Sequence, residues 1–263
     1  MLLSEIWCYP VKSCAGIPLE RAKVGPRGIH LDRHWMLINQ DGRFVSQRQL
    51  PRMALIRPRF VEEGLRLEAP GISALEIGED AHCGRTVSVQ VWRDRCAAME
   101  VGDAANAWFS SLLGETVRLV FLPAGERRTV DQDCASATDE VGFADGFPFL
   151  LIGRASLDDL AGRMGCALDI RRFRPNLVVT GSAPYAEDTW SRVRIGGLSF
   201  RVAKPCSRCA VTTVNPDLGE RDLDTLGALR TYRQRENRVY FGQNLIHDAA
   251  GELVAGDPVA PTG

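Results

Sequence analysis

The chain has 263 residues, with 32 lysines and arginines against 33 aspartates and glutamates, and a formal net charge of −1. At about 150 residues per domain, this length corresponds to one large domain or two small ones. A hydrophobic content of 45% and a charged content of 25% exclude a disordered chain, and the balanced charge gives no overall attraction to nucleic acid or to an anionic membrane.

The first third of the chain predicts short β-strands. They are expected over residues 6–11, 34–39, 43–47, 55–61, 65–69 and 86–91. Asp41-Gly42 and Glu63-Gly64 supply the turn signals between successive strands. Short strands at this spacing favour a barrel or a sandwich over βαβ units.

A helix and a long loop are predicted in the middle of the chain. Residues 103–113 carry apolar side chains at helical spacing, with Asp103 as the expected N-cap and Gly114 as the terminator. A strand follows over residues 117–122. The polar stretch 123–143 has a length typical of functional loops.

The last part of the chain mixes helices with further strands. A helix is expected over 155–164, capped near Ser156. The remaining expected elements are strands over 177–180, 192–195, 199–202 and 210–214, a helix over 223–233, and a closing hairpin within 251–260. The sequence therefore predicts a mainly β protein with some α-helix (α+β), with a β-rich unit on each side of a boundary near residues 95–120.

The cysteine content is the unusual part of the composition, with eight cysteines against four histidines. The N-terminus lacks the basic and apolar pattern of a signal peptide, and no apolar run approaches the roughly 18 residues of a membrane span. We therefore expect a cytoplasmic protein with mostly free thiols and no membrane association. In a reducing compartment a close cysteine pair indicates metal binding or catalysis rather than a disulfide.

The most informative motif is Lys204-Pro205-Cys206-Ser207-Arg208-Cys209. Two thiols three positions apart can reach one metal ion or form a redox pair, and nearby cations favour the thiolate that ligates metals. Three alternatives stay open. The pair could be two small buried side chains before a strand; a structural zinc site would need two further ligands; a thioredoxin-like dithiol would need a βαβ context.

Basic and polar side chains also gather at the ends of apolar segments. They are Lys12, Ser13, Asp32, Arg33, Gln47, Arg48, Gln49, Arg174 and Asn176. Such donors bind phosphate and polar heterocycles. Taken singly, each is equally consistent with a solvated surface charge, so a binding site requires that they converge in space.

Several ordered motifs resemble a known family. YPVKSCAG (9–16), DRHW (32–35) and SQRQ (46–49) are similar to the N-terminal β-barrel domain that precedes MOSC domains. The motifs similar to the MOSC domain itself are FADGFPFLL (143–151), FRPNLVV (173–179), KPCSRCAVTTV (204–214), FGQNL (241–245) and GDPV (256–259). The chain thus resembles bacterial YcbX-like proteins and the mitochondrial amidoxime-reducing component family. The resemblance implies a MOSC N-terminal β-barrel domain over residues 1–118 and a MOSC β-barrel domain with peripheral helices over 119–263.

The resemblance also implies a molybdenum cofactor (molybdopterin) and the residues that hold it. Cys209 would be the metal ligand and the catalytic residue, with Cys206 as a neighbour. The implied cofactor contacts are Lys12, Ser13, Arg33, Arg174, Asn176, Arg208, Gly146 and Phe147. Gly146 and Phe147 replace a Thr-Ser pair of the mitochondrial relatives, so backbone N–H groups would stand in for hydroxyls there. Gln243 and Asn244 lie in matched motifs without a defined role.

The implied activity is molybdenum-dependent reduction of N-hydroxylated compounds: amidoximes, hydroxylamines and N-hydroxylated bases. Because the sequence contains no plant-type iron–sulfur cysteine run, electrons are expected from a separate protein, either a flavoprotein reductase, a ferredoxin or a cytochrome b5-like protein. No nucleic-acid partner and no pyridoxal phosphate are expected. Asp32 and Asp145 are the candidate general acids. The alternative is a non-catalytic module that carries the molybdenum cofactor or sulfur.

Overall fold

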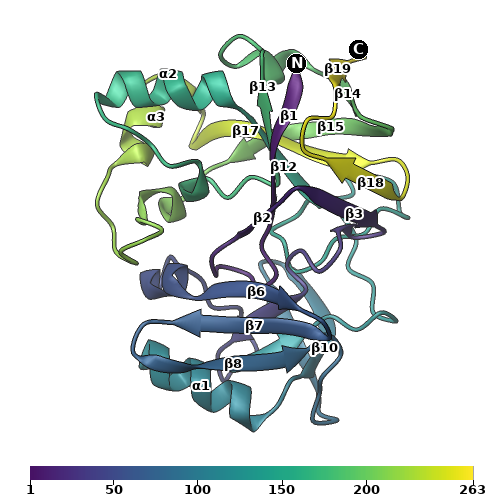
Figure 1. Cartoon of the computed structure of the whole chain (residues 1–263), viewed down its shortest axis with the longest axis vertical. Helices are drawn as coiled ribbons and strands as arrows, with labels where there is room; N and C mark the ends of the chain where they lie inside the picture. Colours follow the sequence, from purple (N-terminus) through teal and green to yellow (C-terminus); the bar gives the residue numbers. More distant parts are fainter. Residues whose placement is uncertain (263) are drawn as a thin grey trace.

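The structure, a computed structural model, describes residues 1–262 and has two lobes stacked one above the other (Figure 1). The upper lobe is built on a nine-stranded sheet in the order β19-β14-β15-β17-β12-β13-β1-β2, with β16 paired to β17. Its strands are β1 (Leu2–Cys8), β2 (Ile17–Leu19), β12 (Phe149–Gly153), β13 (Leu177–Thr180), β14 (Arg192–Ile195), β15 (Leu198–Ser207), β16 (Gln234–Arg235), β17 (Arg238–His247) and β19 (Val259–Pro261).

Two helices and a small sheet complete the upper lobe. Helices α2 (Arg154–Met164) and α3 (Thr225–Arg233) lie together on one side of it (Figure 1). Their apolar faces form one core cluster with Ile152 and Phe241 of the sheet. The small sheet has the order β18-β3-β4. Its strands are β3 (Arg21–Gly25), β4 (Gly28–Ile29) and β18 (Gly251–Val254).

The lower lobe contains two further sheets and one helix (Figure 1). The four-stranded sheet, in the order β5-β11-β10-β9, and the three-stranded meander β6-β7-β8 enclose a second core together with α1. The elements are β5 (Trp35–Ile38), β6 (Arg57–Val61), β7 (Gly64–Ala69), β8 (Ile72–Gly78), β9 (Thr86–Val91), β10 (Asp94–Glu100), α1 (Asp103–Leu113) and β11 (Arg118–Phe121). Gly114 ends α1 in the left-handed conformation, as expected for a helix terminator.

The predicted fold class is confirmed, because residues 1–262 are mostly β with three α-helices. The two lobes, however, are not contiguous in the sequence. Strand β1 pairs with β13, and β3 pairs with β18 near the C-terminus. Residues 2–29 therefore contribute to the sheets of the upper lobe. The division at residues 118 and 119 stays a prediction.

Five local predictions are wrong. Asp103 is not the N-cap of α1, because Gly102 occupies that position and no side chain there makes a capping hydrogen bond. Residues 210–214 do not form a strand; Ala210–Thr213 is a 3₁₀ turn. The segment 251–260 is not a hairpin, because β18 pairs with β3 and β19 with β14. Ser156 does not cap α2, since its hydroxyl donates to Glu187 instead. Residues 43–47 make only isolated bridge contacts, although the Asp41-Gly42 turn is present.

Candidate functional site

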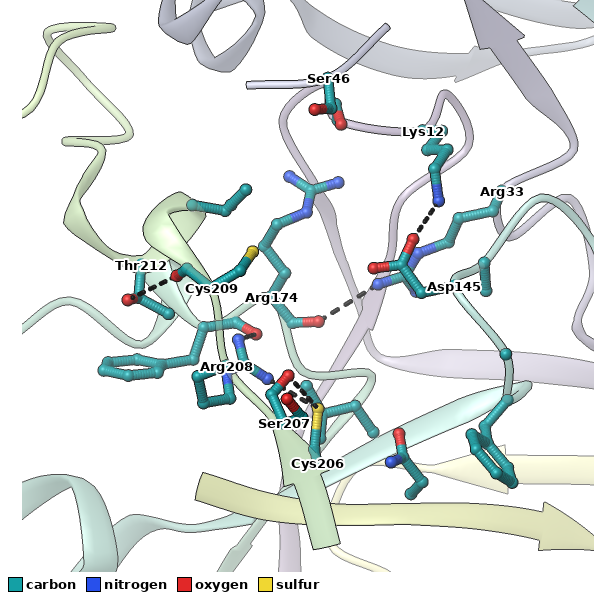
Figure 2. A pocket seen from close by; sticks show the side chains of 18 of the residues that line it. Lys12, Arg33, Ser46, Asp145, Arg174, Cys206, Ser207, Arg208, Cys209 and Thr212 are labelled. Carbon is teal, nitrogen blue, oxygen red and sulfur yellow. Dashed lines mark hydrogen bonds and ion pairs between the residues drawn. The ribbon is translucent and has the colours of Figure 1, made fainter. Parts of the chain in front are cut away.

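All nine residues predicted for the site line one pocket, to which both lobes contribute (Figure 2). They are Lys12, Ser13, Arg33, Gly146, Phe147, Arg174, Asn176, Arg208 and Cys209. Three of them hold strained backbone in the left-handed region: Ser13 (φ 68°), Arg33 (φ 48°) and Arg174 (φ 55°). Non-glycine residues in this region are uncommon and gather at functional sites.

Cys209 stands at the end of a strand that leads into the pocket. Strand β15 ends at Ser207, and the Cys209 backbone starts the 3₁₀ turn Ala210–Thr213. Its carbonyl accepts hydrogen bonds from the backbone N–H and the hydroxyl of Thr212, both at 3.2 Å (Figure 2). These bonds fix the Cys209 backbone, while Arg48 Nη1 lies 3.8 Å from the Cys209 Sγ atom.

Arg208 holds the other cysteine of the motif and retains one unused donor. Its Nη1 donates to Cys206 Sγ at 3.1 Å, and its Nη2 donates to the carbonyl of Phe173 at 2.6 Å (Figure 2). Its Nε is buried and finds no hydrogen-bond partner within the described part of the chain. A buried unpaired donor is costly, so this N–H indicates a ligand acceptor.

Two arginines contact the ring of Tyr9. The Arg33 and Arg174 guanidinium groups lie 4.4 Å and 4.3 Å from the ring centroid. Arg33 is neutralised by Asp32 at 2.5 Å and also donates to the Asn176 side chain at 3.0 Å.

Arg174 lacks a comparable counter-charge. Its Nη1 donates to the Cys14 carbonyl at 2.5 Å, and no carboxylate within residues 1–262 forms an ion pair with it. Burial, together with the repulsion from Arg33, lowers the pKa of Arg174 to about 10. An enclosed cation without a carboxylate is suited to an anionic ligand group.

Lys12 and Asp145 face each other on the side of the pocket away from Cys209 (Figure 2). The Lys12 ammonium pairs with the Asp145 carboxylate and donates to the carbonyl of Phe143 at 2.8 Å. Burial lowers the pKa of Lys12 to about 8, although Asp145 opposes this shift. The adjacent Lys12 ammonium holds the pKa of the Asp145 carboxyl well below its usual range.

The pocket also contains residues to which the sequence gave no role. They are Phe44, Ser46 and Thr212, which line it beside the candidate general acid Asp145. Arg48, one of the polar donors noted in the sequence, reaches Cys209. The SQRQ segment that contains Ser46 and Arg48 was a usable signal, because it was one of the matched motifs. Phe44 precedes that motif and carried no signal of its own.

The donor set fits a molybdenum cofactor. A soft cysteine thiolate at the pocket wall suits a metal that prefers sulfur. The unneutralised Arg174 and the unpaired Arg208 N–H suit an anionic, acceptor-rich group such as a pterin phosphate. Among the described residues, no group of three or more His, Cys, Asp or Glu side chains is placed to hold a metal ion.

Comparisons with known proteins agree with this arrangement. Residues 1–116 match the model of the MOSC N-terminal beta barrel domain, and residues 138–260 match the model of the MOSC domain. Mitochondrial amidoxime reducing component 2 of Bos taurus is 34% identical over 280 residues, covering 98% of this chain and 82% of that protein. The chain belongs to the MOSC family. Mitochondrial amidoxime-reducing component 1 of Homo sapiens is also 34% identical, over 275 residues, with the same coverage.

Two more distant similarities complete the comparison. A molybdenum cofactor sulfurase of Oryza sativa is 29% identical to this MOSC protein over 283 residues, covering 97% of the chain and 34% of the sulfurase. A crystal structure of the YUAD protein of Bacillus subtilis aligns over 98% of this chain and 93% of that one, at 11% identity and a TM-score of 0.43. That structural similarity is too low to carry an argument.

The expected cytoplasmic localisation is wrong on this comparison. The amidoxime reducing components that match this MOSC protein over 98% of its length are named as mitochondrial. Free thiols indicate a reducing environment, and this property does not distinguish the cytoplasm from other reducing compartments. No helix in the described residues is both long and apolar enough to cross a bilayer.

Proposed function

We propose that this MOSC protein is a molybdenum-cofactor-dependent reductase of N-hydroxylated compounds, with electrons delivered by a separate protein. The observation that supports the proposal most strongly is the convergence of Cys209 and the cationic side chains in one pocket. The full-length similarity to proteins named amidoxime reducing components supports the substrate class. The reaction takes an amidoxime to an amidine and water, and consumes two electrons and two protons.

In this proposal, different residues of the pocket bind different parts of the cofactor. Cys209 ligates the metal, Arg174 and Arg208 bind the phosphate and pterin acceptors, and Asn176 orients Arg33 through its side-chain oxygen at 3.0 Å. When bound, the cofactor supplies the two-electron chemistry at the N–O bond.

Neither candidate carboxyl group fits the role of general acid. The Lys12 ammonium keeps Asp145 ionised, and both Asp32 oxygens are used, one by the Tyr9 backbone N–H at 2.8 Å and the other by Arg33. Lys12 is the better proton donor, because its pKa of about 8 lies close to neutral pH. We therefore propose that Lys12 Nζ holds the proton that the reaction needs and that the Asp145 carboxylate orients this ammonium group.

The test is metal analysis followed by turnover. The protein is purified from a host that makes the cofactor, and its metal content is measured by mass spectrometry. Reduced methyl viologen is then supplied, and conversion of benzamidoxime to benzamidine is followed. Molybdenum with turnover supports the proposal; zinc in place of molybdenum contradicts it.

A second candidate function is a module that carries the cofactor or its sulfur without turnover. The similarity to a molybdenum cofactor sulfurase, of which this chain covers 34%, favours it. Bound molybdenum without reduction of any N-hydroxylated compound, together with transfer of labelled cofactor to an apo-acceptor enzyme, would support the carrier over the reductase.

A further inference from the structure

A second cavity adjoins the pocket that contains Cys209 and shares two lining residues with it. This groove, of about 770 Å³, includes Phe44, Arg48, Gln49, Gln90, Trp92 and Thr116 among its lining residues. We name it the Trp92 groove. Phe44 and Arg48 also line the pocket that contains Cys209. A volume of this size lies within the range of small-molecule sites.

Trp92 is placed unusually for a large apolar residue. It follows β9 in the turn to β10, its side chain is 47% exposed, and its φ of 57° lies in the left-handed region. A bulky residue in this conformation is a strained exception, and such strain gathers at ligand sites. The Trp92 carbonyl accepts a hydrogen bond from Gln90 at 2.8 Å, which helps to hold the turn.

Arg48 connects this exposed indole to the thiol. Its guanidinium lies 4.3 Å from the Trp92 ring centroid and 5.4 Å from that of Phe44, and the two rings are 5.2 Å apart. The same guanidinium lies 3.8 Å, through Nη1, from Cys209 Sγ. The aromatic pair of Trp92 and Phe44 is therefore connected to the Cys209 thiol through the Arg48 guanidinium.

We propose that the Trp92 groove binds the planar aromatic or heteroaromatic part of the substrate. This inference rests on the proposed reductase function and deepens it, because it selects N-hydroxylated compounds carried on a conjugated ring over aliphatic ones. The exposed indole offers a stacking surface. Gln49 Oε1 is taken up by Ser46, so the Gln49 amide N–H₂ remains a donor for ring heteroatoms.

The positive charge of the groove favours binding of a neutral substrate over binding of a cationic product. Arg43 and Arg48 outnumber Glu115 among its lining residues. An amidoxime is neutral near pH 7, whereas the amidine formed from it is a cation. Repulsion by the two arginines then weakens product binding. Benzamidine is accordingly expected to bind less tightly than benzamidoxime.

The test measures binding rather than turnover. Benzamidoxime and the aliphatic acetamidoxime are titrated by calorimetry into the holoenzyme without an electron donor, for the parent protein and for Trp92→Ala, Trp92→Phe and Phe60→Ala. Phe60 is a matched control, because it is an exposed aromatic residue outside the groove lining. We expect Trp92→Ala to weaken benzamidoxime binding about ten-fold and acetamidoxime binding less than two-fold. Trp92→Phe should stay within about three-fold of the parent, and Phe60→Ala should have no effect.

Two results would overturn the inference. One is equal weakening of both ligands by Trp92→Ala, and the other is unchanged benzamidoxime binding in that variant. The proposed function fails separately. If benzamidoxime binding depended on Trp92 but reduced methyl viologen gave no benzamidine, the ring-binding groove would be supported and the reductase function contradicted.

Discussion

Lys12 and Asp145, 133 residues apart in the sequence, form an ion pair in the wall of the pocket that contains Cys209. The pair brings a residue of the N-terminal segment against the long loop that precedes β12. Because Lys12 is buried and its pKa is lowered to about 8, its charge changes close to physiological pH. This relationship leads to the first prediction.

Anion binding in the pocket should weaken as the pH rises through about 8. Lys12 is protonated below its folded-state pKa of about 8 and loses its positive charge above it, so the attraction for an anion disappears between about pH 7 and 9. The Kd of sulfate for the cofactor-free protein, measured by calorimetry across this range, checks the effect, because the charge of sulfate does not change between these pH values. A Lys12→Arg variant keeps its charge and should give a flat profile; an equally steep profile in that variant would assign the titration to another group.

The two cysteines of the motif should respond differently to substitution. Cys209→Ser removes the proposed metal ligand and should reduce both bound molybdenum and benzamidoxime reduction to background. Cys206→Ser should retain most of both, because the Cys206 sulfur contacts Arg208. Molybdenum per protein, measured by mass spectrometry, separates the variants. Equal losses of molybdenum in both variants would contradict the assignment of Cys209 as the metal ligand.

The convergence of the candidate site residues was easier to predict than the elements that carry them. Motif resemblance named nine residues, and all nine line one pocket. The motifs did not predict the backbone conformation after Cys209, where the β-prone residues Val211, Thr212 and Thr213 indicated a strand. The hydroxyls of both threonines donate to carbonyls three residues earlier, and this local bonding favours a 3₁₀ turn.

Long-range pairing and turn strain explain what else the sequence did not reveal. Strand β1 pairs with β13, and the Ser4 hydroxyl donates to a carbonyl 174 residues away. Local periodicity carries no information about such partners. Trp92 was missed because an aromatic residue after a strand looks ordinary in the sequence, whereas its positive φ and its contact with Arg48 exist only in the folded chain.

Arg174 should contribute to cofactor binding and should contribute little to the stability of the fold. Its guanidinium has no carboxylate partner within the described residues, so Arg174→Met removes a poorly compensated charge, one hydrogen bond to Cys14 and the contact with the Tyr9 ring. We expect the free energy of unfolding to change by less than about 1 kcal/mol, while cofactor content falls at least about ten-fold. Urea unfolding and molybdenum analysis measure the two effects.

Arg172 provides the matched control for that experiment. Its side chain is buried and makes two 2.7 Å hydrogen bonds to Asp222, and through these it lowers the pKa of Asp222 to about 2. Arg172→Met leaves the Asp222 carboxylate with Asn215 as its remaining side-chain donor, at 2.6 Å, and should destabilise the fold by about 2 kcal/mol. If Arg174→Met destabilised the protein as much as Arg172→Met does, Arg174 would be a structural residue rather than a ligand-binding one.

Gly146 should matter only when the cofactor is bound. A Cβ atom at this position would meet no protein atom within 4 Å, and the Gly146 backbone needs no positive φ. Gly146→Ala should therefore leave the cofactor-free protein as stable as the parent or about 0.5 kcal/mol more stable. If the cofactor approaches this backbone closely, as proposed from the absence of hydroxyl side chains at residues 146 and 147, the added methyl group should lower cofactor content. Gly197→Ala, equally open but in the turn between β14 and β15, is the control, and the fluorescence of the oxidised pterin after its release reports the content. Equal pterin content in the two variants would show that Gly146 makes no close approach to the cofactor.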